Sequence, residues 1–391
     1  MKMHFFKTFE FEFETTRLLW YVPSGGADYG EVASVSEKIK DGDYNSWYQE
    51  WKGFAEKLEL RGEGFKLNES KGNAFLRASR YYQAAEFFLD PKDSKKIEVY
   101  NKSVSLFYKG LSAKGIEYKH AEIPYDGAVL RTMYFQTTKE SKGTFFICGG
   151  FDAFLEELYF TNVLAALASG YDVVLYEGPG QSNVIRKYKR SFEANWSNVA
   201  GAVVHYYLAE YDLKTPKIGV GVSLGGLLVA RAASLDHTLF DKVIFFNYFP
   251  GMIESLKKSL PRFLHSYLSK GFPPILERIC SAYIARNKFL NWQVEHAKWV
   301  FSGNTLNDLV MIFQEFSETI VYDNLKTGCL ILVAKEDNYY DYQLGIDFFN
   351  KITVKNKKLI LFDKTKYSSN FHCQNGAAYD ANDQIFEWLT E

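Results

Sequence analysis

One pentapeptide, Gly221-Val222-Ser223-Leu224-Gly225, constrains the fold of this chain more than any other feature. It joins an apolar run typical of a β-strand, residues 217–222, to an apolar run typical of a helix, residues 224–233. Glycines on both sides of a serine let backbone segments pass closely, and a sharp strand-to-helix turn lifts the hydroxyl clear of the sheet. The pattern therefore predicts a nucleophile elbow, in which Ser223 is the candidate nucleophile and the Leu224 N–H helps to bind an oxyanion. The alternative is a glycine-rich turn that carries an ordinary solvated serine.

The chain divides near residue 115 into two unlike parts. From about Ser36 to Lys114, aromatic and aliphatic side chains recur at helical spacing, so we expect residues 1–115 to form a mainly helical domain. From there on, short β runs alternate with helical stretches, which predicts a mostly parallel sheet with helices on both faces. The expected strands span residues 118–124, 128–136, 143–148, 171–176, 217–222, 242–249, 328–334 and 358–362.

The β signal disappears between Pro250 and Lys326, where helical stretches return. A helical insertion after one strand of such a sheet commonly covers an active site. We therefore expect a helical lid at residues 250–326, which divides the α/β core into a first part, residues 116–249, and a second part, residues 327–391.

An acid and a histidine follow the serine in the chain order that accompanies this kind of elbow. The apolar run 330–334 ends at the carboxyl edge of the expected sheet, where α/β folds place functional groups, and after Lys335 comes the acidic pair Glu336-Asp337. Asp337 is the favoured acid, with Glu336 and Asp341 as alternatives. His372 is the one among seven histidines that lies in the loop before the final helix, so it is the candidate general base. This order favours the elbow over a solvated serine turn.

Two glycines, Gly149 and Gly150, follow the expected strand 143–148 and let the backbone approach a substrate carbonyl. We expect the N–H of Phe151 to form the oxyanion hole together with that of Leu224, and Gly150 to line the substrate site. The alternative is that the two glycines only make a tight exit from the strand. A further turn at residues 177–182 lacks the lysine of a phosphate-binding loop.

The charge balance argues against a polyanionic partner. The 391 residues include 46 lysines and arginines against 47 aspartates and glutamates, a formal net charge of -1. Nothing therefore points to nucleic acid or to an anionic membrane surface, and a neutral small molecule is the more natural substrate. The 27 tyrosines and 33 phenylalanines favour a cyclic or aromatic substrate, although most of these rings are expected to pack in the core.

The sequence carries no sign of secretion, membrane insertion or metal binding. Glu10, Glu12 and Glu14 interrupt the N-terminal segment, which lacks the apolar region of a signal peptide, and no apolar run reaches the ~18 residues of a membrane span. The four cysteines are scattered without CxxC spacing, which favours reduced thiols over disulfides or zinc. We therefore expect a cytoplasmic protein that needs no cofactor and no metal.

Four features together resemble those of one group of α/β-hydrolases: Gly149-Gly150-Phe151-Asp152, the turn at 177–181, the elbow, and the His372-Cys373 loop. The group includes 2,6-dihydroxypseudooxynicotine hydrolase and fungal hydrolases that shorten polyketide chains. Residues 80–88 are similar to a helix in the N-terminal domain of that group, so the resemblance covers most of the chain. It implies an α/β-hydrolase fold preceded by a helical domain, and a homodimer.

The resemblance also implies a chemistry, because members of the group hydrolyse, without a cofactor, a ketone C–C bond flanked by activating groups, or an ester or amide. An acidic residue after the strand that follows the nucleophile helix assists substrate handling in the group. Glu254 is its nearest match here, and the alternative is a solvated lid carboxylate. Ala153 and Gln181-Ser182 depart from the group's pattern, which leaves the substrate open.

The residues and the resemblance together predict acyl transfer to Ser223 followed by hydrolysis. The bond cleaved is expected to be the C–C bond of a β-diketone-like or aryl ketone substrate, or the C–N bond of an N-acyl lactam or amide. The alternatives are a carboxylesterase, a serine peptidase or an acyltransferase that uses the same triad. A binding protein that keeps the hydrolase fold without catalysis is the alternative outside enzymes.

Overall fold

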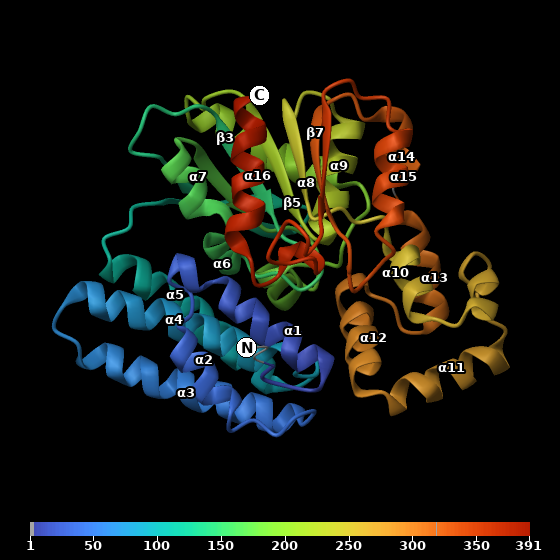
Figure 1. Cartoon of the computed structure of the whole chain (residues 1–391), viewed down its shortest axis with the longest axis horizontal. Helices are drawn as coiled ribbons and strands as arrows, with labels where there is room; N and C mark the ends of the chain where they lie inside the picture. Colours follow the sequence, from blue (N-terminus) through green and yellow to red (C-terminus); the bar gives the residue numbers. More distant parts are fainter. Residues whose placement is uncertain (1–3, 318) are drawn as a thin grey trace. The chain divides into compact units, whose positions relative to one another are not determined.

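The computed structural model describes residues 4–317 and 319–391. Its contacts divide the chain into one compact unit up to Tyr118 and another from Lys119 onward (Figure 1). The first unit is helical, and its helices begin well before residue 36, where the helical pattern becomes clear in the sequence. They are α1 (Phe9–Trp20), α2 (Tyr29–Ser36), α3 (Tyr44–Gly64), α4 (Asn68–Phe87) and α5 (Ser94–Ala113).

Local sequence signals explain where two of these helices begin. The carboxylates of Asp43 and Asp93 accept hydrogen bonds from backbone N–H groups in the first turns of α3 and α5. Such caps satisfy N–H groups that have no partner within the helix. The same unit buries large aromatic rings: Trp51 of α3 stacks on Tyr81 of α4 with ring centroids 5.4 Å apart, and both side chains are fully buried.

The second unit is built on one eight-stranded sheet with the strand order β1-β2-β4-β3-β5-β6-β7-β8. β2 pairs antiparallel with β1 and with β4, and the remaining neighbours are parallel. The predicted, mostly parallel sheet is therefore confirmed. The strands are β1 (Lys119–Tyr125), β2 (Ala128–Phe135), β3 (Thr144–Cys148), β4 (Asp172–Tyr176), β5 (Lys217–Val222), β6 (Lys242–Phe246), β7 (Gly328–Ala334) and β8 (Lys357–Phe362).

Helices cover both faces of this sheet (Figure 1). Successive side chains of a strand point to opposite faces, so β3 shows which helices each face carries. Phe145 contacts Phe386 of α16, whereas Phe146 lies in the core cluster that α8 and α9 complete. The helices flanking the sheet are α6 (Leu155–Leu158), α7 (Leu164–Ser169), α8 (Trp196–Glu210), α9 (Leu224–Leu235), α15 (Gln343–Lys351) and α16 (Ala378–Thr390).

Helices also fill the segment between β6 and β7, called the helical insertion below. Phe301 connects it to the main core, because its ring centroid lies 5.0 Å from that of Phe192. None of the helices within residues 4–317 and 319–391 has both the length and the apolar character to cross a bilayer. The insertion comprises α10 (Met252–Ser259), α11 (Pro274–Arg286), α12 (Lys288–Phe301), α13 (Leu306–Glu315) and α14 (Thr319–Asn324).

Candidate active site

Ser223 occupies the turn between β5 and α9 with φ 60° and ψ -126°. This left-handed conformation is unfavourable for a residue with a Cβ atom, so the surrounding packing must hold it. The Ser223 N–H donates to the carbonyl of Phe246 at 2.8 Å, which ties the turn to β6. A Cβ atom on Gly221 would collide with the Gly225 carbonyl, and one on Gly225 would lie 2.6 Å from the Gly149 carbonyl oxygen. The first glycine therefore lets the turn close, and the second lets the loop after β3 approach it. The sequence therefore builds a sharp elbow at Ser223.

Three residues far apart in the sequence meet at the carboxyl edge of the sheet. The Nε2 atom of His372 lies 2.7 Å from the Ser223 Oγ, and its Nδ1 atom lies 2.6 Å from the Asp337 Oδ2. They follow β5, β7 and β8, whose carboxyl ends lie at one edge because these strands run parallel. A carboxylate only accepts hydrogen bonds, so Nδ1 carries the imidazole proton and Nε2 accepts from the serine hydroxyl. The structure thus brings together the three residues of the predicted triad.

Asp337 and His372 are both buried: 2% of the surface of Asp337 and 4% of that of His372 is exposed. Burial disfavours the charged imidazole, but the adjacent Asp337 carboxylate outweighs it and raises the pKa of His372 well above its usual value. The charged imidazole that forms when His372 takes a proton is therefore stabilised. The alternative acids lie elsewhere: Glu336 is exposed, and Asp341 accepts the N–H of Gln343 at the start of α15.

Asp337 is held by a buried network that the sequence analysis missed. Its Oδ1 accepts the Tyr339 N–H at 2.8 Å, and its Oδ2 accepts from the Asn247 side chain at 3.1 Å. Asn247 in turn donates to the Tyr340 hydroxyl and accepts from the Gln374 amide at 2.9 Å. Burial and the Asp337 carboxylate raise the pKa of Tyr340, so its phenol stays protonated. One signal pointed to this network: Asn247 is a polar residue within the apolar run that was expected to be a strand up to residue 249.

The loop after β3 passes in direct contact with the elbow. A Cβ atom on Gly150 would lie 2.8 Å from the Val222 carbonyl oxygen and 3.0 Å from the Leu224 nitrogen. Among the described residues, no acceptor meets the N–H of Phe151 or of Leu224. Leu224 is the first residue of α9, so its N–H belongs to the unpaired, electropositive start of that helix. Both expected oxyanion donors are therefore open for a ligand beside the serine.

A second turn, at residues 177–182, holds this loop through hydrogen bonds. Gln181 donates from its amide nitrogen to the Gly149 carbonyl at 2.6 Å and accepts the Gly178 N–H at 3.0 Å. Arg131 of β2 anchors the same turn through Glu177, with an ion pair of 2.8 Å between buried side chains. The glycine-proline turn at 177–182 is therefore buried and holds the loop after β3 in the candidate site.

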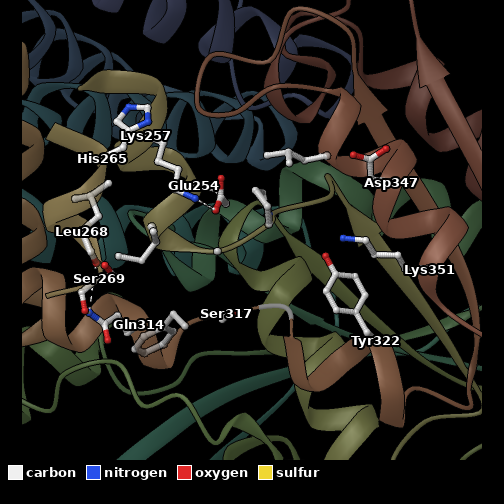
Figure 2. A pocket seen from close by; sticks show the side chains of 15 residues that line it. Glu254, Lys257, His265, Leu268, Ser269, Gln314, Ser317, Tyr322, Asp347 and Lys351 are labelled. Carbon is white, nitrogen blue, oxygen red and sulfur yellow. Dashed lines mark hydrogen bonds and ion pairs between the residues drawn. The ribbon is translucent and has the colours of Figure 1, made fainter. Parts of the chain in front are cut away.

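Glu254 lies apart from these residues. It is on α10, where it forms an ion pair with Lys257 at 2.5 Å, and it lines a cavity of about 700 Å³ beside α15 (Figure 2). The other lining side chains that Figure 2 labels include Tyr322, Asp347 and Lys351. The described residues that line this cavity do not include the triad. A role of Glu254 in substrate handling stays a prediction.

The described residues offer no cluster of three histidine, cysteine, aspartate or glutamate side chains placed to hold a metal ion. The site instead presents a hydroxyl bonded to an imidazole, a carboxylate behind that imidazole, and two backbone N–H groups nearby. Set at the carboxyl edge of a mostly parallel sheet, this arrangement is that of an α/β-hydrolase. Residues 139–366 match the family described as serine aminopeptidase, S33, and the chain belongs to that family of hydrolases.

Known relatives extend along almost the whole chain. The 20-hydroxy-prefusarin hydrolase FUS2 of Gibberella moniliformis is 30% identical over 410 residues, 97% of this chain and 95% of the relative. The hydrolase LUC6 of a Fusarium species is 30% identical over 408 residues, 97% of this chain and 96% of the relative. The crystal structure of 2,6-dihydroxy-pseudo-oxynicotine hydrolase has a TM-score of 0.74 at 16% identity and covers 95% of this chain and 94% of its own. The predicted fold and the predicted group of relatives are confirmed.

Proposed function

We propose that the protein is a serine hydrolase that removes an acyl group from a small apolar, cyclic or aromatic molecule through an acyl-enzyme on Ser223. The hydrogen-bonded series from Ser223 through His372 to Asp337 carries this proposal. A serine hydroxyl is a weak nucleophile at neutral pH, and an adjacent imidazole base is the arrangement that activates it. The open N–H groups of Phe151 and Leu224 supply the electrostatic half of the same reaction.

The reaction begins when the Ser223 Oγ attacks the acyl carbon and His372 Nε2 takes the hydroxyl proton. The carbonyl oxygen becomes an oxyanion, which accepts hydrogen bonds from the two backbone N–H groups, while Asp337 stabilises the charged imidazole. As the bond to the leaving group breaks, His372 returns the proton to that group. Water then attacks the acyl-enzyme with His372 as base, and the acid leaves as Ser223 regains its proton.

The leaving group limits the substrates that this sequence of steps can accept. When carbon leaves, its electron pair must be stabilised as an enolate or within a hydroxylated arene. An N-acyl lactam presents the same kind of electrophile, because its nitrogen anion is delocalised into the ring carbonyl. The names of FUS2 and of the solved pseudo-oxynicotine hydrolase each specify a small organic compound, which supports a substrate of that size for this chain.

The test is covalent labelling by a fluorophosphonate, which reacts with activated serines, combined with a substrate panel. We expect the wild-type protein to be labelled and Ser223→Ala to remain unlabelled. Ser234→Ala is the matched control, because that serine lies on α9 and its hydroxyl bonds the Ala230 carbonyl at 2.8 Å. Products from β-diketones, N-acyl lactams, aryl esters and peptides are then identified by mass. An unlabelled wild-type protein that hydrolyses none of them would overturn the proposal.

A further inference from the structure

The backbone around Phe151 is held from two sides by side chains that are distant in sequence. Gln181, in the turn after β4, reaches the carbonyls before Phe151, and His296, on α12 of the helical insertion, reaches the carbonyl of Phe151 itself. Nothing in the sequence marks His296, whose hydrogen-bond partner is 145 residues away. His296 therefore contacts the loop after β3, residues 149–152, at the residue whose N–H is an expected oxyanion donor.

His296 is fixed by aromatic packing. The residue is 5% exposed, and its ring lies 5.4 Å from the Trp292 ring and 5.5 Å from the Trp299 ring, measured between centroids. It also packs on the Phe151 ring at 4.7 Å. Its Nε2 atom lies 3.2 Å from the Phe151 carbonyl oxygen, and a carbonyl only accepts, so Nε2 carries the proton and donates.

Gln181 holds the preceding residues from the other side. Its amide oxygen accepts the Gly178 N–H, which fixes the amide orientation and directs Nε2 toward the loop. Nε2 then lies 2.6 Å from the Gly149 carbonyl oxygen and 3.4 Å from that of Gly150. The residue is 3% exposed, so water competes little for these hydrogen bonds.

These contacts decide where the Phe151 N–H points. In a trans peptide unit the carbonyl and the N–H point in opposite directions. Because Gln181 draws the Gly150 carbonyl to one side, the Phe151 N–H of the same peptide unit is directed to the other. His296 holds the next peptide unit, so the backbone on both sides of Phe151 is fixed. An oxyanion donor works only when its direction is set before the reaction.

We propose that His296 and Gln181 are positioning residues that aim the Phe151 N–H at the oxyanion, an inference that rests on the serine hydrolase function proposed above. His296 belongs to the helical insertion, whereas Phe151 and Gln181 belong to the α/β core. The insertion therefore contributes to transition-state binding through one hydrogen bond. Neither side chain contacts the reacting atoms, and each acts through the backbone of the loop.

The test compares His296→Leu with His296→Gln, using kcat and KM for an aryl ester, the affinity for an arylboronic acid, and the melting temperature. Leucine fills space without a donor, and glutamine replaces the Nε2 donor by an amide N–H. We expect His296→Leu to lower kcat by about 10- to 100-fold with KM nearly unchanged, and to weaken boronate binding by a similar factor. His296→Gln should recover most of this loss. His265→Leu is the matched control, because its Nε2 pairs with the Leu260 carbonyl at 3.0 Å in the same insertion.

Gln181→Glu tests the second contact independently of the first. A carboxylate still accepts the Gly178 N–H but repels the Gly149 carbonyl, so we expect a similar loss in kcat. Gln314→Glu is its control, because that amide also donates to two backbone carbonyls, those of Leu268 and Ser269. If His296→Leu does not fold, the comparison of Gln181→Glu with Gln314→Glu still tests the proposal.

Two results would overturn the inference. The first is a folded His296→Leu or Gln181→Glu variant with wild-type kcat and boronate affinity. The second is a His296→Gln variant as impaired as His296→Leu, which would assign His296 to aromatic packing. Fluorophosphonate labelling separates the two proposals: a labelled wild-type protein with unaffected variants refutes only the positioning role. An unlabelled, inactive wild-type protein refutes the hydrolase function and this inference with it.

Discussion

Replacing Gly150 by alanine tests the contact between the loop after β3 and the elbow. The new Cβ atom would lie 2.8 Å from the Val222 carbonyl oxygen, 0.6 Å short of the 3.4 Å at which ordinary contacts begin. It would also lie 3.0 Å from the Leu224 nitrogen and the Ser223 Cβ. These atoms belong to the backbone or to the root of a side chain and cannot rotate away. The loop and the elbow must therefore separate by roughly half an ångström.

That separation acts on catalysis more than on folding. A misplacement of about 1 Å in a catalytic group costs roughly 10²-fold in rate, so we expect Gly150→Ala to lower kcat by about 10- to 100-fold. Overpacking a single methyl group costs about 1–3 kcal/mol, so the protein should still fold. The measurements are kcat on an activated ester and the melting temperature.

Gly53→Ala is the control for that experiment. A Cβ atom at Gly53 in α3 meets nothing within 4 Å, and alanine favours a helix over glycine by about 1 kcal/mol. We expect this variant to keep wild-type kcat with equal or higher thermal stability. Wild-type kcat in Gly150→Ala would refute the reasoning, because the loop would then not need to touch the elbow.

Three further predictions concern the candidate site, and a fourth concerns the oligomeric state. Ser223→Ala should lower kcat by up to ~10⁶-fold and leave the circular dichroism spectrum unchanged; retention of more than a few per cent of activity would exclude this nucleophile. Asp337→Asn should lower kcat by about 10⁴-fold, whereas Asp341→Asn, at the start of α15, should not. Because the pKa of His372 is raised, kcat/KM should fall as the pH drops through a value above 6.5, where protonation removes the base. In Asp337→Asn, which lacks the carboxylate that raises this pKa, the fall in kcat/KM should occur at a lower pH. Light scattering should show a homodimer of twice 45.0 kDa, and a monomer at micromolar concentration would contradict that expectation without affecting the triad.

The meeting of Ser223, Asp337 and His372 could be predicted because each follows a strand in the parallel part of one sheet. Ser223 and Asp337 follow the carboxyl ends of two strands, and His372 lies in the loop after a third, so the three residues must meet at one edge of the sheet. Chain order and strand position therefore sufficed to predict that these three residues lie together. The supporting contacts gave much weaker signals, because Asn247 and His296 depend on partners 90 and 145 residues away.

One local pattern misled at the end of β6. The expected strand 242–249 follows an apolar run, but β6 ends at Phe246, and the side chain of the next residue, Asn247, donates to Asp337. The segment Phe9-Glu10-Phe11-Glu12-Phe13-Glu14 alternates with a period of two, which is typical of a strand, yet it lies in helix α1. Phe11 is fully buried against Trp47 and Phe88 there, and this packing outweighs the local pattern.

The place at which the helical insertion joins the sheet has a consequence for how such enzymes diversify. The insertion leaves the sheet after β6 and returns at β7, so its length can change without moving the strand ends that carry the triad. Exchanging it between relatives would then be a route to a new substrate, provided that the contacts joining it to the core are kept, among them the hydrogen bonds from His296 to Phe151 and from Lys258 to the Asp337 carbonyl. If His296 has the proposed positioning role, an insertion taken from a relative must place an N–H group against the Phe151 carbonyl. Without that N–H group, the chimaera would gain a new binding surface but lose turnover.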